Sequence, residues 1–222
     1  MLFFRIIIFS ILFYSYSFGD KIAVATKVKG EVELMKVGKK KFMDLRPGVI
    51  LDDGDKIRTG RTGFVAVIFI DDKSTLKLKE DSEIVITGQR TAASISKKIN
   101  MDGGTIRATV NKQNIDFVIQ TPTSVASVKG TDFWLLSDPN TGDQVIGLEG
   151  TIGLVNSETG QEVDVTVGMT GSSTPDGQVI SAETDPNSIP SDPSAAQEGP
   201  SKVRIYLEGP EGTQKVLVIE YQ

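Results

Sequence analysis

The sequence predicts an all-β domain built of short strands, and three observations support this fold class. Short runs of alternating apolar and polar residues recur from residue 21 to residue 167, and turn residues separate them at roughly 8–12 residue spacing. After the first 19 residues, Val, Ile and Leu supply most of the large apolar side chains, which favours strands. The chain has no cysteine and no histidine, so its stability must come from β-pairing and packing.

The expected strands follow one another along this region. Residues 64–70 (FVAVIFI) are apolar at every position, as in a strand that is covered on both faces. The other strands alternate, and we expect them at residues 31–34, 74–79, 83–87, 105–110, 115–119, 145–148, 152–155 and 163–167. Residues 90–100 have no clear period and fit a loop or a single helical turn.

The first 19 residues have the pattern of a secretory signal peptide. Arg5 is their only charged residue, an apolar run of about a dozen residues follows it, and Ser17 and Gly19 stand where a cleavage site has small residues. No later stretch is apolar over the roughly 20 residues that a membrane-spanning helix needs. We therefore expect a periplasmic or secreted protein, and an uncleaved N-terminal anchor is the alternative.

Composition divides the rest of the chain into three parts. Residues 20–169 form the expected β-domain. Residues 170–201 are rich in Ser, Pro, Gly and Asp and have little to bury, which predicts a flexible linker. Residues 202–222 alternate again on both sides of a Gly-Pro-Glu-Gly turn, which predicts a β-hairpin. Because an isolated hairpin is marginally stable, it must dock on the domain or add strands to a partner, and docking is favoured.

The stretch TPTSVASVKGTDF, residues 121–133, is the most distinctive motif. Pro122 cannot donate a hydrogen bond to a neighbouring strand, so it marks a strand edge or corner. Gly130 permits positive φ or a close backbone approach, and Thr131 and Phe133 resume a strand. The motif therefore predicts a corner at which two strands pack closely.

Together with other blocks, this motif resembles the FecR domain over residues 24–179. The blocks are LRPGVILDDGDKIRTG (residues 45–60), AVIFIDDKSTLKL (66–78), a Gly-Gly pair (103–104), Glu-Gly (149–150) and a glycine at 168. The resemblance implies an all-β domain, either solenoid-like or a twisted sandwich. The residues that carry it are expected to be structural: Gly54, Asp55, Thr59, Gly60, Thr121, Pro122, Gly130, Thr131 and Phe133.

The sequence departs from the family in two places. The family's signalling members carry a cytoplasmic segment that holds a sigma factor, but only four residues precede Arg5, so we do not expect that regulator role here. Asp72-Lys73 stands where the family often has Gly-Ser, and Ser74 follows one residue later. This second departure predicts a slightly different hairpin and the same fold.

Several groups of residues carry possible chemistry, and a structural role is favoured for each. Paired carboxylates can hydrolyse glycosides, but acids in Asp-Gly and Asp-Asp contexts usually cap turns; the candidates are Asp52, Asp53, Asp55, Asp71, Asp72 and Glu149. Residues 138–143 (DPNTGD) have calcium-like oxygen spacing but lack the full calcium-loop pattern, and a hairpin turn explains them as well. Lys39, Lys40 and Lys41 fit a solvated turn, and burial is favoured for Trp134.

These features predict an exported, non-enzymatic FecR-like binding or scaffold domain that needs no cofactor and no metal. The net charge of −5, which becomes −6 without the leader, argues against nucleic acid as a partner. We expect an envelope protein or a cell-wall polymer instead, recognised through strand edges and loops. The alternatives are a carbohydrate- or peptidoglycan-binding module that uses Trp134, and an envelope sensor anchored by an uncleaved leader.

Overall fold

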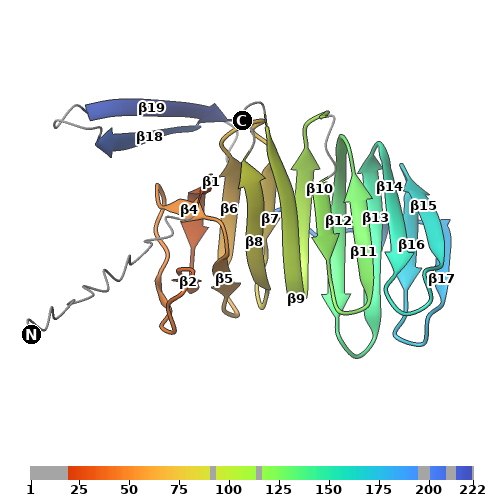
Figure 1. The fold of residues 1–222 in the computed structure, drawn as a ribbon. Helices are drawn as coiled ribbons and strands as arrows, with labels where there is room; N and C mark the ends of the chain where they lie inside the picture. Colours follow the sequence, from red (N-terminus) through yellow and green to blue (C-terminus); the bar gives the residue numbers. More distant parts are fainter. Residues whose placement is uncertain (1–19, 91–93, 114–116, 195–200, 209–213, 222) are drawn as a thin grey trace, which may run out of the picture.

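The computed structural model describes residues 20–90, 94–113, 117–194, 201–208 and 214–221 (Figure 1). These residues form β-strands and one short 3₁₀ helix, η1 (Pro186–Ser188). The strands of the main body are β1 (Lys21–Lys29), β2 (Val32–Met35), β3 (Met43–Asp44), β4 (Ile50–Asp52), β5 (Asp55–Thr59), β6 (Phe64–Phe69), β7 (Thr75–Leu78), β8 (Glu83–Arg90), β9 (Ile95–Val110), β10 (Phe117–Gln120), β11 (Ser124–Val128), β12 (Thr131–Asp138), β13 (Gly142–Glu149), β14 (Thr151–Asn156), β15 (Glu162–Thr166), β16 (Met169–Ser173) and β17 (Val179–Glu183). A separate hairpin contains β18 (Ser201–Glu208) and β19 (Gln214–Tyr221).

The main body is a sandwich of two sheets, which confirms the all-β prediction. Sheet A has the order β4-β1-β6-β7-β9-β12-β13-β16-β17. Sheet B has the order β3-β2-β5-β8-β9-β10-β11-β14-β15. The long strand β9 belongs to both sheets, with its first half in sheet B and its second half in sheet A. From β6 in sheet A and from β5 in sheet B, strand order follows chain order, so the sandwich grows along one axis as a solenoid does (Figure 1).

An aliphatic core fills the space between the two sheets. Val65, Val67 and Phe69 of β6 point into this core, and the ring of Phe69 meets that of Phe117 edge-on at 5.5 Å. All six residues of β6 are buried, because its other face is also covered. This confirms the sequence prediction for a strand that is buried on both sides.

The prediction of a flexible linker over residues 170–201 is wrong for most of its length. β16 pairs with β13, and β17 pairs with β16, so both strands extend sheet A. Backbone hydrogen bonds form these strands, and small residues permit close packing; a Cβ atom on Gly171 would lie 2.3 Å from Val165. These strands therefore form although few of their side chains are large and apolar.

Residues 185–194, called the C-terminal strap below, run back across the outer face of sheet A. The carboxylate of Asp192 accepts hydrogen bonds from Lys77 Nζ at 2.7 Å and from Arg107 Nη1 at 2.9 Å. The same carboxylate accepts hydrogen bonds from the amide and the hydroxyl of Ser194. The strap is thus attached to β7 and β9, far from the strand it leaves.

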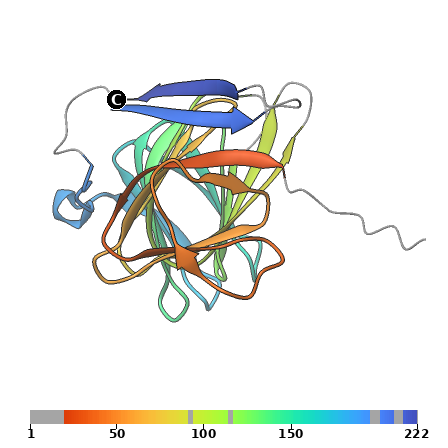
Figure 2. The same cartoon turned by 90° about the vertical axis from the view of Figure 1, so that its left-hand side faces the viewer.

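The C-terminal hairpin docks on the outer face of sheet A, as the sequence favoured. Ile205 and Ile219 are buried against Val24 of β1 and Ile68 of β6. Figures 1 and 2 show the hairpin lying across one side of the body, close to β1. The hairpin therefore covers the apolar outer side of β1 and β6.

Three further expectations concern residues 90–100, the predicted signal peptide and membrane-spanning segments. Residues 90–100, which the sequence left undecided, contain the end of β8 and the beginning of β9, while residues 91–93 lie outside the described part. The predicted signal peptide, residues 1–19, also lies outside it. Among the residues that the structure describes, no helix is long and apolar enough to span a membrane.

Candidate functional site

The first group of motif residues organises the turn before β5. Asp55 is fully buried, and its carboxylate accepts hydrogen bonds from Lys36 Nζ at 2.7 Å and from the backbone amides of Val37 and Asp52. Lys36 also pairs with Asp52 at 2.8 Å. The side chain of Asp55 therefore joins the end of β2, the end of β4 and the start of β5. Gly54 and Gly60, which flank this strand, lie in tight turns that contact Val37 and Glu31.

Thr59 connects β5 to the bend in β9 through Ser82. The hydroxyl of Thr59 donates to the carbonyl of Lys79 at 2.6 Å and accepts from the amide of Ser82 at 2.9 Å. The hydroxyl of Ser82 in turn accepts from the amide of Thr105 at 2.9 Å. Gly104 sits in this bend with φ +115°, and a Cβ atom there would lie 2.4 Å from Ser82 Cα, so only glycine fits.

The second group of motif residues forms a buried hydrogen-bond cluster. The hydroxyl of Thr121 accepts from the amide of Ser124 at 2.9 Å and donates to Asp143 Oδ2 at 2.5 Å. The hydroxyl of Ser124 donates to the same carboxylate oxygen at 2.5 Å. Asp143 is 2% exposed, and its other oxygen has no partner among the described residues. The TPTS corner is therefore tied to the β12–β13 hairpin.

The rest of the motif forms the predicted corner. Gly130 has φ +146°, and a Cβ atom on it would lie 3.0 Å from Lys112 Cα. Thr131 and Phe133 are buried in β12, and Phe133 belongs to the core. Pro122 lies at the start of the TPTS turn and lines a small cavity with Pro139 and Pro175. The nine motif residues do not converge on one cavity.

The carboxylates considered for catalysis are held in local hydrogen bonds. Asp53 accepts from the amide of Gly88, and Asp52 and Asp55 bind Lys36. Glu149 is exposed at the end of β13. None of these acids lines the groove described below.

Asp71 and Asp72 hold a buried lysine that the sequence did not single out. The side chain of Lys97 is fully buried, and its Nζ lies 2.8 Å from Asp71 Oδ2 and 2.9 Å from Asp72 Oδ2. Burial raises the pKa of Asp71, but hydrogen bonds from Lys97 and the amide of Ile95 outweigh it, so the pKa lies below its ordinary value. Three charged side chains thus bind one another near the β6–β7 turn.

Residues 138–143, whose oxygen spacing also suited calcium, form a hairpin turn between β12 and β13. Asp138 Oδ1 accepts from the amide of Asn140 at 2.7 Å, and Asp143 points into the cluster with Thr121. No group of three acidic, histidine or cysteine side chains that could hold a metal occurs in the described ranges.

Trp134 is 1% exposed on the outer face of sheet A, with Arg107 Cζ 5.8 Å from its ring centre. Lys39, Lys40 and Lys41 are exposed, as expected.

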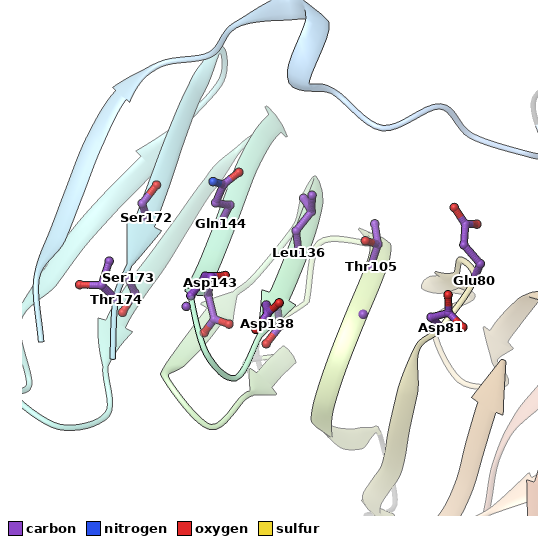
Figure 3. Close-up of a pocket in the computed structure, with 14 residues that line it drawn as sticks. Glu80, Asp81, Thr105, Leu136, Asp138, Asp143, Gln144, Ser172, Ser173 and Thr174 are labelled. Carbon is purple, nitrogen blue, oxygen red and sulfur yellow. The ribbon is translucent and has the colours of Figure 1, made fainter. Parts of the chain in front are cut away.

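The candidate site is an acidic groove along one edge of the sandwich. Two cavities, of about 470 and 660 Å³, share Asp81, Gly104, Ser137 and Asp138 and so form one groove. The β7–β8 turn, the bend of β9 and the β12–β13 turn line it side by side (Figure 3).

The groove is lined by hydroxyls and carboxylates. The acidic side chains of its wall are Glu80, Asp81, Glu83, Asp102, Asp138 and Asp143. One cation, Arg58, lines it among the described residues, and Arg58 is paired with Glu33 at 2.5 Å. Lys56 forms ion pairs with Glu83 and Asp102, and its positive charge partly offsets their negative charge. The wall formed by Asp81 and Asp138 therefore keeps its negative charge, which suits a cationic ligand.

Sequence reasoning missed this groove because its residues come from turns far apart in the chain. One signal was visible, however. Residues 130–201 contain twelve Asp and Glu and no Lys or Arg. The groove borders this acidic part of the chain, which continues to the β15 and β17 end of the body.

Comparisons with known proteins agree with the predicted resemblance. Residues 55–153 match the family described as FecR protein. Two crystal structures of a "putative anti-sigma factor" from Parabacteroides distasonis ATCC 8503 are similar, with TM-scores of 0.50 and 0.49 and 14% identity. Each alignment covers 59% of this chain and 60% of that chain, so this chain spans less than two thirds of that protein. The first of them shows the shared fold. No curated protein matches the chain.

Proposed function

Because residues 55–153 form a FecR domain, we propose that this chain is an exported, non-enzymatic binding domain whose acidic groove holds a positively charged segment of a partner protein. The single observation that carries the proposal is the wall of Asp81 and Asp138, which no described cation neutralises. The polar lining supplies hydrogen-bond acceptors for lysine or arginine side chains.

The carbohydrate-binding alternative is less well supported by the groove. Sugar sites usually stack the sugar on an exposed aromatic ring, and none of the residues that line the groove is aromatic. Trp134, on which that alternative depended, is 1% exposed and lies beside Arg107 on the outer face of sheet A.

A labelled octapeptide tests the proposal directly. Fluorescein-labelled (Lys-Ser)₄ should bind the protein, and (Glu-Ser)₄ should not. In the variant D81N/D138N, affinity for (Lys-Ser)₄ should fall roughly tenfold, because each exposed ion pair contributes up to about 1 kcal/mol. Asn keeps the turn geometry at both positions, since Asp81 has φ 52° and Asp138 caps the turn at Asn140.

The matched control removes the same number of negative charges from residues that lie away from the groove. E158Q/E162Q removes two exposed carboxylates near the β14–β15 turn, and its affinity for the peptide should stay within about twofold of the wild type. Equal losses in both variants, or no binding of (Lys-Ser)₄, would refute the groove as a site for basic segments. Binding of soluble peptidoglycan fragments that D81N/D138N abolishes would replace the proposal with the carbohydrate alternative.

A further inference from the structure

Exposed apolar side chains of the main body gather at its two ends. Val37 and Met43, 49% and 53% exposed, lie at the end formed by β3 and β4. Val167 and Ile180, each 60% exposed, lie at the end formed by β15 and β17. Figure 1 shows these two ends on opposite sides of the body. An apolar surface at each end is what a contact between two ends requires.

The two ends carry opposite charge. Beside Val37 and Met43, the exposed loop before β3 holds Lys39, Lys40 and Lys41. Beside Val167 and Ile180, the exposed charged side chains are all acidic: Glu158, Glu162, Asp164, Asp176, Glu183 and Asp185. In the described part of the chain, these lysines and these acids form no ion pair with one another or with other residues. Their charge is therefore available to a partner.

The strands at both ends have a free edge. Within the described residues, β17 pairs with β16 alone and β15 with β14 alone. At the other end, β3 pairs with β2 alone and β4 with β1 alone. The edge of β17 lacks lysine and proline, the residues that usually protect an edge, and it exposes Ile180 instead.

We propose that the acidic end of one copy binds the basic end of a second copy. Two basic ends repel each other and so do two acidic ends, so charge selects the head-to-tail contact alone. The contact buries Val37 and Met43 of one copy against Val167 and Ile180 of the other. Because each bound copy still presents one free end, the contact repeats and builds a chain of molecules.

Sedimentation velocity over a concentration series tests this proposal. The wild-type protein should form species larger than a monomer at low ionic strength and should dissociate as salt is raised, because exposed charges are screened. K39E/K40E/K41E and E162K/D164K should each be monomeric. A mixture of these two variants should associate again, because each variant then meets an end of opposite charge.

Two controls keep the result specific. K73E/K98E/K112E reverses three exposed lysines away from the ends and should associate like the wild type. D81N/D138N changes the groove and should also associate normally, so this inference and the proposed function can fail separately. Recovery in the mixture excludes misfolding as the cause of monomeric variants. A wild type that stays monomeric at hundreds of micromolar and low salt, or variants whose mixture stays monomeric, would overturn the head-to-tail contact.

Discussion

Asp55 shows how one buried side chain can hold several segments together. It receives hydrogen bonds from Lys36 and from two backbone amides, and it is completely buried. Such a carboxylate is stable only because each of its contacts is satisfied, since an unpaired buried charge costs several kcal/mol. The carboxylate of Asp55 therefore connects residues near the ends of β2 and β4 to the start of β5.

The backbone of Lys73 is strained. It has φ 61° in the β6–β7 turn, a conformation that costs a side-chain-bearing residue about 1–2 kcal/mol relative to glycine. Replacing Lys73 with glycine should raise the free energy of unfolding by about 0.5–1 kcal/mol, once the greater freedom of glycine in the unfolded chain is included. Urea denaturation measures the change. Lys73→Ala should give no such gain, and an equal gain from both changes would contradict the backbone explanation.

At the scale of elements, the strap is held by one carboxylate. Burial raises the pKa of Asp192, but hydrogen bonds from Lys77 and Ser194 outweigh it, and the pKa lies well below its ordinary value. The hydrogen bond to Asp132 raises the pKa of Arg107 and outweighs burial, which lowers it, and the charge of Asp192 raises it further. These ion pairs attach residues 185–194 to β7 and β9.

The sign of the pKa shift predicts how the strap responds to acid. A carboxylate with a lowered folded-state pKa contributes stability above its unfolded pKa of about 3.9, and this stability is lost as pH falls through the folded value. Asp192→Asn should therefore destabilise the protein at neutral pH by about 1–3 kcal/mol and flatten the stability profile below pH 4. The fluorescence of Trp134, the only tryptophan in the chain, reports the change beside Arg107.

Asp185→Asn is the control for this prediction. Asp185 lies in the same strap but is exposed, and its side chain caps η1, which asparagine can also do. Its stability profile should match the wild type. Equal effects of the two substitutions would mean that Asp192 does not anchor the strap.

Elements with strong alternation could be predicted from the sequence, and weakly apolar ones could not. β6 and β7 were expected within one residue of their observed bounds, because β6 is apolar at every position and the apolar residues of β7 alternate. β16 was missed because Gly, Ser and Thr dominate it, and β17 was missed because it is short and follows a Ser-, Pro- and Gly-rich stretch. Backbone pairing of β16 with β13, and of β17 with β16, forms these strands. The motif corner was expected from Pro122 and Gly130, but its bond to Asp143 depends on strand register.

The groove could not be predicted from the sequence, because it also depends on how distant strands are arranged. Its walls meet only because β9 crosses from one sheet to the other at Gly104, where the Ser82 hydroxyl fixes the bend. Sequence spacing shows the Gly-Gly pair but does not show which turns lie beside it. The absence of lysine and arginine from residues 130–201 was the one visible sign of a charged surface.

At the scale of the molecule, the C-terminal segment covers an apolar outer face. Val24 and Ile68 lie beneath the hairpin, and Trp134 and Ile146 are buried on the same face of sheet A. A chain that ends at residue 184 should expose these four side chains and aggregate. Its association should strengthen in ammonium sulfate, since such salts favour apolar burial, whereas the head-to-tail contact weakens with salt.

A second truncation separates the effect of the strap from the effect of the hairpin. A chain that ends at residue 200 keeps the strap, so the emission of Trp134 should remain close to that of the full chain. A chain that ends at residue 184 should show red-shifted emission. Identical spectra from both truncations would mean that the strap does not shield the outer face around Arg107.

The agreement between strand order and chain order bears on how the polypeptide matures. A chain that emerges amino end first, from a ribosome or a narrow pore, can complete its sandwich from one end to the other, since β10 to β17 each pair with strands near them in the sequence. Of the described strands, those of the hairpin come last in the chain, and they pack over β1, which comes first. Folding in this direction would leave the packing of the hairpin on β1 and β6 as its final step.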